Sequence, residues 1–351
     1  MDTTTSDASP RRPTMTDVAR IAGVSLKTVS RVINGVATVD EDMAARVRAA
    51  AAQLRFRANF AASTLRSGSS SATIGLLTKD LSNEFYATIA SGVADVARAH
   101  QTQLITAHSG ENPEDEMEAI FDLCRRRVDG LLIVPTGGDH SVLRSEIDLG
   151  IPMVFLDRRP VGLDADSVVI DNFVGARDAT LALISEGHTR IGVLVDTLNM
   201  PTMRQRVEGI QAAFTAERLP WDDSLLITDV RGPTEASIAV DRLLSLAAPP
   251  TAFFCGNNRS SIGALRTLWE QRRTEALVAF DDFQLAELMP RPFRVLRYDN
   301  RAMGALGAEL LFRRISGEVF DPVTVVLPTE LCPRGIQDFQ QSTSRSQNDH
   351  A

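Results

Sequence analysis

Cysteine is scarce in this sequence. The three cysteines, Cys124, Cys255 and Cys332, lie far apart along 351 residues. An odd number at this spacing forms neither a disulfide framework nor a metal-ligand pattern, and it is typical of a reducing compartment. The five histidines show no metal-ligand spacing either. We therefore expect a cytoplasmic protein without a metal centre.

Long apolar runs and catalytic motifs are also missing. No apolar run approaches the roughly 18 residues needed to span a bilayer. The first residues, MDTTTSDASPRRP, lack the hydrophobic segment of a secretory signal. There is no nucleophile motif and no glycine-rich phosphate loop. These absences predict no membrane contact, no cofactor and no catalytic residues.

Positive charge is scarce overall but concentrated near the N-terminus. The whole chain carries a net charge of −8. Residues 1–66 nevertheless hold ten Lys and Arg against six acids, a net charge of +4, which leaves −12 on the remainder. This asymmetry is typical of a protein whose basic head alone binds nucleic acid, because phosphate repels an acidic body.

Composition also predicts the domain organisation. With 44% hydrophobic residues the chain can bury a large core, and 351 residues exceed one ordinary domain. We predict disordered tails at 1–13 and 340–351, a helical head at 14–57, a hinge and Ser/Gly linker at 58–71, and an α/β body at 72–339.

In the body, short apolar runs alternate with amphipathic helical patterns. We expect strands at 73–77, 103–107, 130–134, 152–156, 191–195, 251–255, 276–280 and 323–327. Alternation over some 260 residues predicts parallel sheets covered by helices, and its length suits two such units better than one.

The head has the pattern of a helix-turn-helix. Thr14 and Asp17 form a capping box for a first helix. Gly23 is free to adopt positive φ in the turn that follows, and Ser25 is a natural N-cap for a second helix. Asp40 caps a third helix. Short helix pairs of this kind occur in many folds, but the coincidence of caps, turn and polar stripe favours DNA binding.

The second helix has one apolar and one polar face. Val29, Val32 and Ile33 are expected to face inward. The side chains left toward solvent are Lys27, Thr28, Ser30, Arg31 and Asn34. This polar stripe would face a major groove.

These residues resemble a known family. TMTDVARIAGVSLKTVSRVING is similar to the DNA-binding signature of the lac-repressor/galactose-repressor family of bacterial transcription regulators. RANFAASTLRSG resembles its hinge, and DLSNEFYATIASGV, RRVDGLLIVP, GIPMVFLDR, EGHTRIGVL, TAFFCGNN and VAFDDF follow its regulatory domain in order. The resemblance implies a homodimeric repressor that binds double-stranded operator DNA. Its periplasmic-binding-protein-like body would have two α/β lobes with a small polar effector, a sugar or sugar derivative, between them.

The resemblance also implies roles for residues of the head and hinge. Thr14 and Ser25 match helix starts that contact phosphate, and Leu26 and Lys27 match positions that set operator preference. Arg31 is the best match for bidentate hydrogen bonds to guanine. In the hinge, Leu65 matches a leucine that enters the minor groove, although a packing role in a linker helix stays open. The full set of implied DNA contacts is Thr14, Ser25, Leu26, Lys27, Thr28, Ser30, Arg31, Asn34, Asn59, Ala62 and Leu65.

In the body the resemblance implies an effector site and also shows departures. The matched residues are Phe85, Tyr86, Arg206, Asn257 and Asp281. Glu84 replaces a usual proline, and Asn258 replaces a usual aspartate. Two other functions stay open at this stage, a solute-binding receptor and an enzyme built on the same body. Asp157, Asp171 and Asp281 are the carboxylates that an enzyme could pair.

Overall fold

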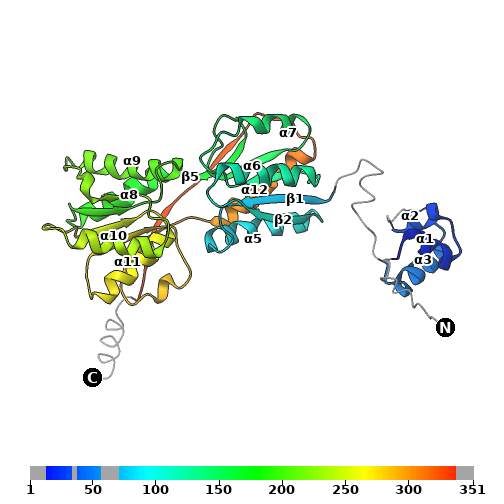
Figure 1. Cartoon of the computed structure of the whole chain (residues 1–351), viewed down its shortest axis with the longest axis horizontal. Helices are drawn as coiled ribbons and strands as arrows, with labels where there is room; N and C mark the ends of the chain where they lie inside the picture. Colours follow the sequence, from blue (N-terminus) through cyan, green and yellow to red (C-terminus); the bar gives the residue numbers. More distant parts are fainter. Residues whose placement is uncertain (1–12, 34–37, 57–70, 337–351) are drawn as a thin grey trace, which may run out of the picture. The chain divides into compact units, whose positions relative to one another are not determined.

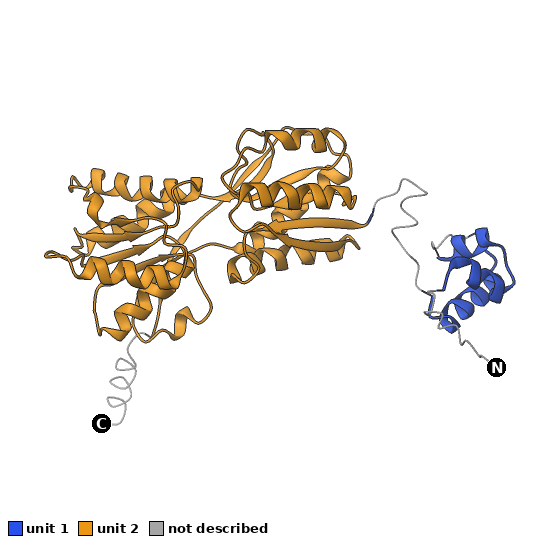
Figure 2. Cartoon of the chain, in the orientation of Figure 1, with its two compact units in different colours: residues 1–71 blue, residues 72–351 orange. Residues whose placement is uncertain are grey.

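A computed structural model describes residues 13–33, 38–56 and 71–336. The chain forms two compact units, residues 1–71 and residues 72–351 (Figure 2). Several predicted features lie outside the described residues. They are the two tails except Pro13, the hinge up to residue 70, and Asn34.

The first unit is a small helical head with three described helices, α1 (Met15–Ala22), α2 (Leu26–Ile33) and α3 (Glu41–Gln53). Their starts confirm the predicted caps. The Thr14 and Asp17 side chains form the capping box, Gly23 has φ 64°, and the Thr28 amide donates to Ser25 Oγ at 3.1 Å. Asp40 accepts from the Met43 amide at 3.2 Å.

The second unit contains two α/β lobes, as the alternating pattern predicts (Figure 1). Lobe 1 has a six-stranded sheet in the order β11-β5-β4-β3-β1-β2, whose neighbours pair in parallel. Its strands are β1 (Thr73–Thr78), β2 (Gln103–His108), β3 (Leu131–Ile133), β4 (Met153–Asp157), β5 (Asp166–Ile170) and β11 (Thr324–Leu327). Its helices are α5 (Glu84–Ala99), α6 (Pro113–Arg125), α7 (Arg144–Asp148) and α12 (Asn300–Ile315).

Lobe 2 has a second six-stranded sheet, in the order β12-β10-β9-β8-β6-β7. Only the β10–β12 pair is antiparallel among the described strands of this sheet. Its strands are β6 (Ile191–Leu194), β7 (Leu226–Ile227), β8 (Ala252–Cys255), β9 (Ala276–Phe280), β10 (Phe293–Arg297) and β12 (Glu330–Arg334). Its helices are α8 (Asn172–Ser185), α9 (Pro201–Ala216), α10 (Pro233–Leu244) and α11 (Asn258–Glu270).

The chain passes between the lobes three times: after β5, between β10 and α12, and between β11 and β12 (Figure 1). The late helix α12 therefore returns to lobe 1, where it packs on α5. Two glycines allow this close packing. A Cβ on Gly92 would lie 2.1 Å from the Arg301 carbonyl oxygen, and one on Gly304 would lie 2.1 Å from that of Ile89.

Candidate functional site

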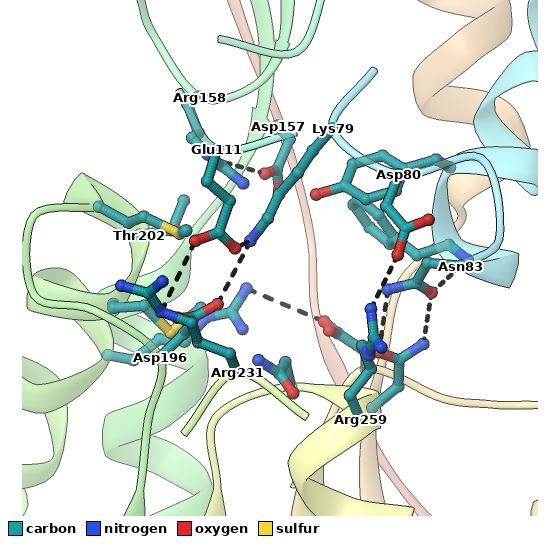
Figure 3. Close-up of a pocket in the computed structure, with 18 of the residues that line it drawn as sticks. Lys79, Asp80, Asn83, Glu111, Asp157, Arg158, Asp196, Thr202, Arg231 and Arg259 are labelled. Carbon is teal, nitrogen blue, oxygen red and sulfur yellow. Dashed lines mark hydrogen bonds and ion pairs between the residues drawn. The ribbon is translucent and has the colours of Figure 1, made fainter. Parts of the chain in front are cut away.

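Polar residues at the ends of strands from both lobes meet at one cavity. Lys79 follows β1 and Asp157 ends β4, while Asp196, Asn257 and Asp281 follow β6, β8 and β9. All five line the cavity, and Figure 3 labels Lys79, Asp157 and Asp196 among them. The carboxyl ends of parallel strands are where α/β sheets place their ligands, because the loops there converge on one edge.

The structure brings together the five effector residues expected from the sequence. Phe85 and Tyr86 come from the first turn of α5 in lobe 1. Arg206 comes from α9, Asn257 precedes α11, and Asp281 follows β9, all in lobe 2. The five line the same cavity. Their contact with an effector stays a prediction.

Arg206 and Asp281 are two of the buried charges of lobe 2. The Arg206 guanidinium lies 3.8 Å from the Asp281 carboxylate and 3.5 Å from the centre of the Phe280 ring. Its Nε donates to Asn172 Oδ1 at 2.8 Å. Burial raises the pKa of Asp281, although Arg206 and a 2.7 Å hydrogen bond from the Tyr298 hydroxyl oppose this shift. The pair is thus a preformed polar anchor held against aromatic rings.

Asn257 takes part in a second interaction that its predicted role did not include. Its side-chain oxygen accepts the Ser260 amide at 2.8 Å and so caps α11. The oxygen is therefore engaged by the helix, and the Asn257 amide group is the part that can serve as a donor to a ligand.

Lobe 1 supplies a matching charged pair. Arg158 donates through Nε to Asp157 at 2.9 Å and through one terminal nitrogen to the Pro135 carbonyl at 2.9 Å. Asp157 has φ 67° and Asp281 has φ 74°. Positive φ is uncommon for residues with a Cβ and is concentrated at functional sites. Both lobes therefore present a carboxylate from a strained strand end.

Side chains of the two lobes also contact each other across the cleft. Arg259 pairs with Asp80 at 2.8 Å, and Lys79 pairs with Asp196 at 3.3 Å (Figure 3). The side chains of Asn83 and Asn258 exchange hydrogen bonds of 2.8 and 3.3 Å. These contacts fix one angle between the lobes.

The two residues that depart from the family pattern belong to these contacts. Asn258 pairs with Asn83, and Glu84 accepts the Gln284 amide of the other lobe at 2.8 Å. Asparagine at position 258 can both donate and accept, which an aspartate cannot. The departures therefore act on the lobe–lobe contact in this structure.

Other residues of the cavity wall were not expected from the sequence. They are Lys79, Asp80, Asn83, Glu111, Arg158, Asp196, Met200, Thr202, Met203, Arg231, Asn258, Arg259 and Tyr298. A polar residue directly after a buried apolar run, as at Lys79 and Asp196, is the signal that could have found some of them.

On the head, α2 exposes most of its predicted DNA face. Leu26 is 48% exposed, and Lys27 and Arg31 are exposed, while Val29 is fully buried beneath them. Thr28 and Ser30 are half-buried. The remaining predicted DNA contacts, Asn34, Asn59, Ala62 and Leu65, lie outside the described residues.

The two helix starts that were predicted to contact phosphate, at Thr14 and Ser25, already have hydrogen-bond partners. The Thr14 amide and hydroxyl both donate to Asp17, at 2.9 and 2.7 Å. The Ser25 hydroxyl lies 2.9 Å from that of Thr28. A phosphate at Ser25 would share this hydroxyl pair, whereas one at Thr14 would compete with Asp17.

An exposed recognition helix and a ligand cleft in one chain define a ligand-controlled DNA-binding protein. In the part of the chain that the structure describes, no helix has the length and apolar character to cross a membrane. Residues 14–59 match the model of bacterial regulatory proteins of the lacI family. Residues 71–286 match the model of periplasmic binding proteins and the sugar-binding domain of the LacI family. The chain belongs to the LacI family of bacterial regulatory proteins.

Individual relatives span nearly the whole chain. It is 31% identical to the ribose operon repressor of Escherichia coli strain K12, over 92% of this chain and 99% of the relative. It is 31% identical to the transcriptional regulator CelR of Thermobifida fusca, over 92% of this chain and 98% of the relative. A solved complex of CelR with cellobiose is 30% identical, with a TM-score of 0.67 over 92% of this chain and 98% of that chain. These relatives are regulators of transcription.

Proposed function

We propose that this protein is a cytoplasmic transcriptional repressor whose operator affinity is set by a small polar effector, a sugar or sugar derivative, bound between the lobes. One observation carries the proposal: an exposed recognition helix and a cleft with Phe85, Tyr86, Arg206, Asn257 and Asp281 occur in one chain. The named relatives support regulation of transcription over an enzyme or a transport receptor.

The proposed mechanism couples the cleft to the DNA through the angle between the lobes. A ligand that touches both lobes favours the angle at which its contacts are best, so it shifts their equilibrium. The contacts Arg259–Asp80 and Asn83–Asn258 define one such angle. A rotation of the first lobes of a dimer would then bring the two hinge segments together or separate them. A helix as short as 59–66 is marginal alone, and a small bias decides whether it forms.

A mobility-shift assay on the DNA upstream of its own gene tests the proposed function. The protein should bind one near-palindromic site, and a compound that raises its melting temperature should change that binding without being consumed. Turnover of the compound, with no change in DNA binding, would favour an enzyme instead.

We expect the protein to act as a homodimer. A twofold protein matches a twofold operator, and one head offers too few contacts for useful specificity. Sedimentation at micromolar concentration should therefore show a dimer. A tetramer, or a monomer that binds the operator with full affinity, would contradict this expectation.

Leu65→Ala is expected to weaken specific binding and reduce operator bending while sparing non-specific binding. A minor-groove wedge acts only where DNA is kinked, whereas non-specific affinity comes mainly from phosphate charge. Circularly permuted operator fragments measure the bend. Unchanged bending in the variant would assign Leu65 to packing.

A further inference from the structure

The cleft continues from the inner cavity into a larger groove on one side. The inner cavity at Arg206 and Asp281 has a volume of about 70 Å³, below the roughly 300–1,000 Å³ of small-molecule sites. The adjoining groove has a volume of about 740 Å³. The two share Lys79, Glu111, Arg158, Met200 and Arg231, so they lie next to each other. The bulk of a ligand fits the groove.

The groove is lined by basic side chains. Four cations, Lys79, Arg158, Arg204 and Arg231, line it, and Glu111 is the acidic side chain among its described lining residues. We call this surface the cationic groove. Lys79 pairs with Glu111 and Asp196, and Arg158 pairs with Asp157, so protein carboxylates already compensate these two charges. Arg204 and Arg231 are the cations whose charge a ligand could compensate.

In the described part of the chain, two of these cations make no hydrogen bond to a carboxylate. The Arg231 guanidinium lies 3.9 Å from Glu111 and 3.8 Å from Asp229, beyond hydrogen-bond distance from both. Arg204 donates to the uncharged carbonyl oxygens of Leu198 and Asn199, at 2.7 and 3.2 Å. Among the described residues Arg204 contacts no carboxylate, whereas Arg231 has two carboxylates at ion-pair distance with which a ligand anion would compete.

A helix start lies at the junction of the groove and the cavity. Helix α9 begins at Pro201, and its N-cap Met200 makes no side-chain cap hydrogen bond. Thr202, in the first turn, lines the inner cavity and is 2% exposed (Figure 3). Its hydroxyl oxygen is buried without a hydrogen-bond partner. A buried hydroxyl is costly when unpaired, so this one marks a place where a ligand atom would bond.

We propose that the effector carries an anionic group, a carboxylate or a phosphate, bound at the start of α9, where the cationic groove meets the inner cavity. The Thr202 hydroxyl and backbone amide would donate hydrogen bonds, because Pro201 has no N–H and the Met203 amide already donates to Met200. Arg231 and Arg204 would supply the charge, and the start of the helix itself favours an anion. The polar body of the ligand would extend toward Arg206 and Asp281. This inference rests on the proposed function and specifies its effector as acidic.

Inorganic phosphate is the simplest probe. We expect phosphate to raise the melting temperature of the full-length protein more than sodium chloride at equal ionic strength, because a ligand of the folded state stabilises it. Arg231→Gln should weaken phosphate binding by about tenfold or more, as loss of a charged hydrogen bond does. Arg242→Gln, an exposed arginine on α10, is the matched control and should behave as wild type.

Two further variants separate ligand binding from stability. Thr202→Val should lose phosphate affinity while keeping the melting temperature in chloride, because the hydroxyl has no partner to lose. Glu111→Gln should strengthen phosphate binding, because it removes a negative charge from the groove. Equal shifts by phosphate and chloride, or equal phosphate binding by wild type, Thr202→Val and Arg231→Gln, would overturn the proposal.

Glucose 6-phosphate, glucuronate and glucose then distinguish the sources of the anionic group. Tighter binding of either acid than of glucose, lost in Arg231→Gln, supports the proposal, and the tighter acid identifies the group. Glucose binding as tightly as both acids would refute it. Operator binding in phosphate-free buffer is measured separately. If the protein did not bind the operator, the proposed function would be contradicted, whereas the proposed anion site would be unaffected.

Discussion

Arg206→Ala is expected to abolish the effect of the effector on operator binding. Its guanidinium joins Asn172 of α8 to the Asp281 carboxylate and stacks on Phe280. Removing it deletes the cationic anchor of the cleft and leaves the buried Asp281 with hydrogen bonds from Tyr298 and the Asn258 backbone but without its charged partner. We also expect the free energy of unfolding of lobe 2 to fall by about 3–5 kcal/mol, as it does when one member of a buried ion pair is removed. Binding of a labelled operator, with and without a compound that stabilises the wild type, measures the response.

Asp281→Asn provides the matched variant, because it keeps the shape of the side chain and removes its charge. Asp281→Asn should also lose the effect of the effector on operator binding. Operator affinity without effector should stay within about tenfold of wild type in both variants, since couplings of 1–3 kcal/mol are typical. A normal ligand-dependent shift in both variants would show that the cleft assignment is wrong. The cross-lobe residues Glu84 and Asn258 would then be tested next.

Arg31→Ala is expected to relax operator preference at one base pair. Arg31 is exposed on α2, one turn after Lys27, above the buried Val29. A bidentate contact with guanine contributes about 1–3 kcal/mol of discrimination, and its loss should equalise binding to the four bases at that position. Titration of operators substituted at each position measures this change.

Arg48→Ala is the control for Arg31→Ala. Arg48 is an exposed arginine of α3 that pairs with Glu41 at 2.9 Å. The Arg48→Ala variant should leave the base preference of operator binding unchanged. If Arg31→Ala weakened binding to all sequences equally, and lowered its salt dependence, Arg31 would be a phosphate contact.

Much of the fold could be predicted because local signals and tertiary structure agree. Side-chain caps at Thr14, Ser25 and Asp40 determine where the head helices start. The eight apolar runs expected as strands all contain strands of the two sheets. Six of them are interior strands of their sheets, for which an uninterrupted apolar run is a sufficient signal. The other two, β2 and β11, are edge strands that are half-buried or exposed.

The strands that were missed depend on partners far along the chain. β5 begins with Asp166, a buried acid that is paired with Arg314 of α12 at 2.7 Å. β12 is an edge strand that contains Pro333, and proline weakens a strand pattern. β10 has two arginines among its five residues, and β7 has two residues. Their pairing is set by neighbours that a local pattern does not reveal.

The site was predictable to a similar degree. The five cleft residues came from resemblance, and the fold places them at one cavity. The charged partners across the cleft, such as Arg259 and Asp80, are separated by many residues and meet only because the chain crosses between lobes three times. Thr202 was not expected either, because an unpaired buried hydroxyl can be recognised only in the folded protein.

Operator affinity at fixed salt, with and without a compound bound in the cleft, tests the central claim most directly. The compound is chosen because it stabilises the wild type and not Arg206→Ala. We predict that it changes the dissociation constant of the wild type for its operator by at least about fivefold and leaves that of Arg206→Ala unchanged. A compound that stabilises the body but leaves the operator affinity of the wild type unchanged would contradict control of DNA binding by the cleft.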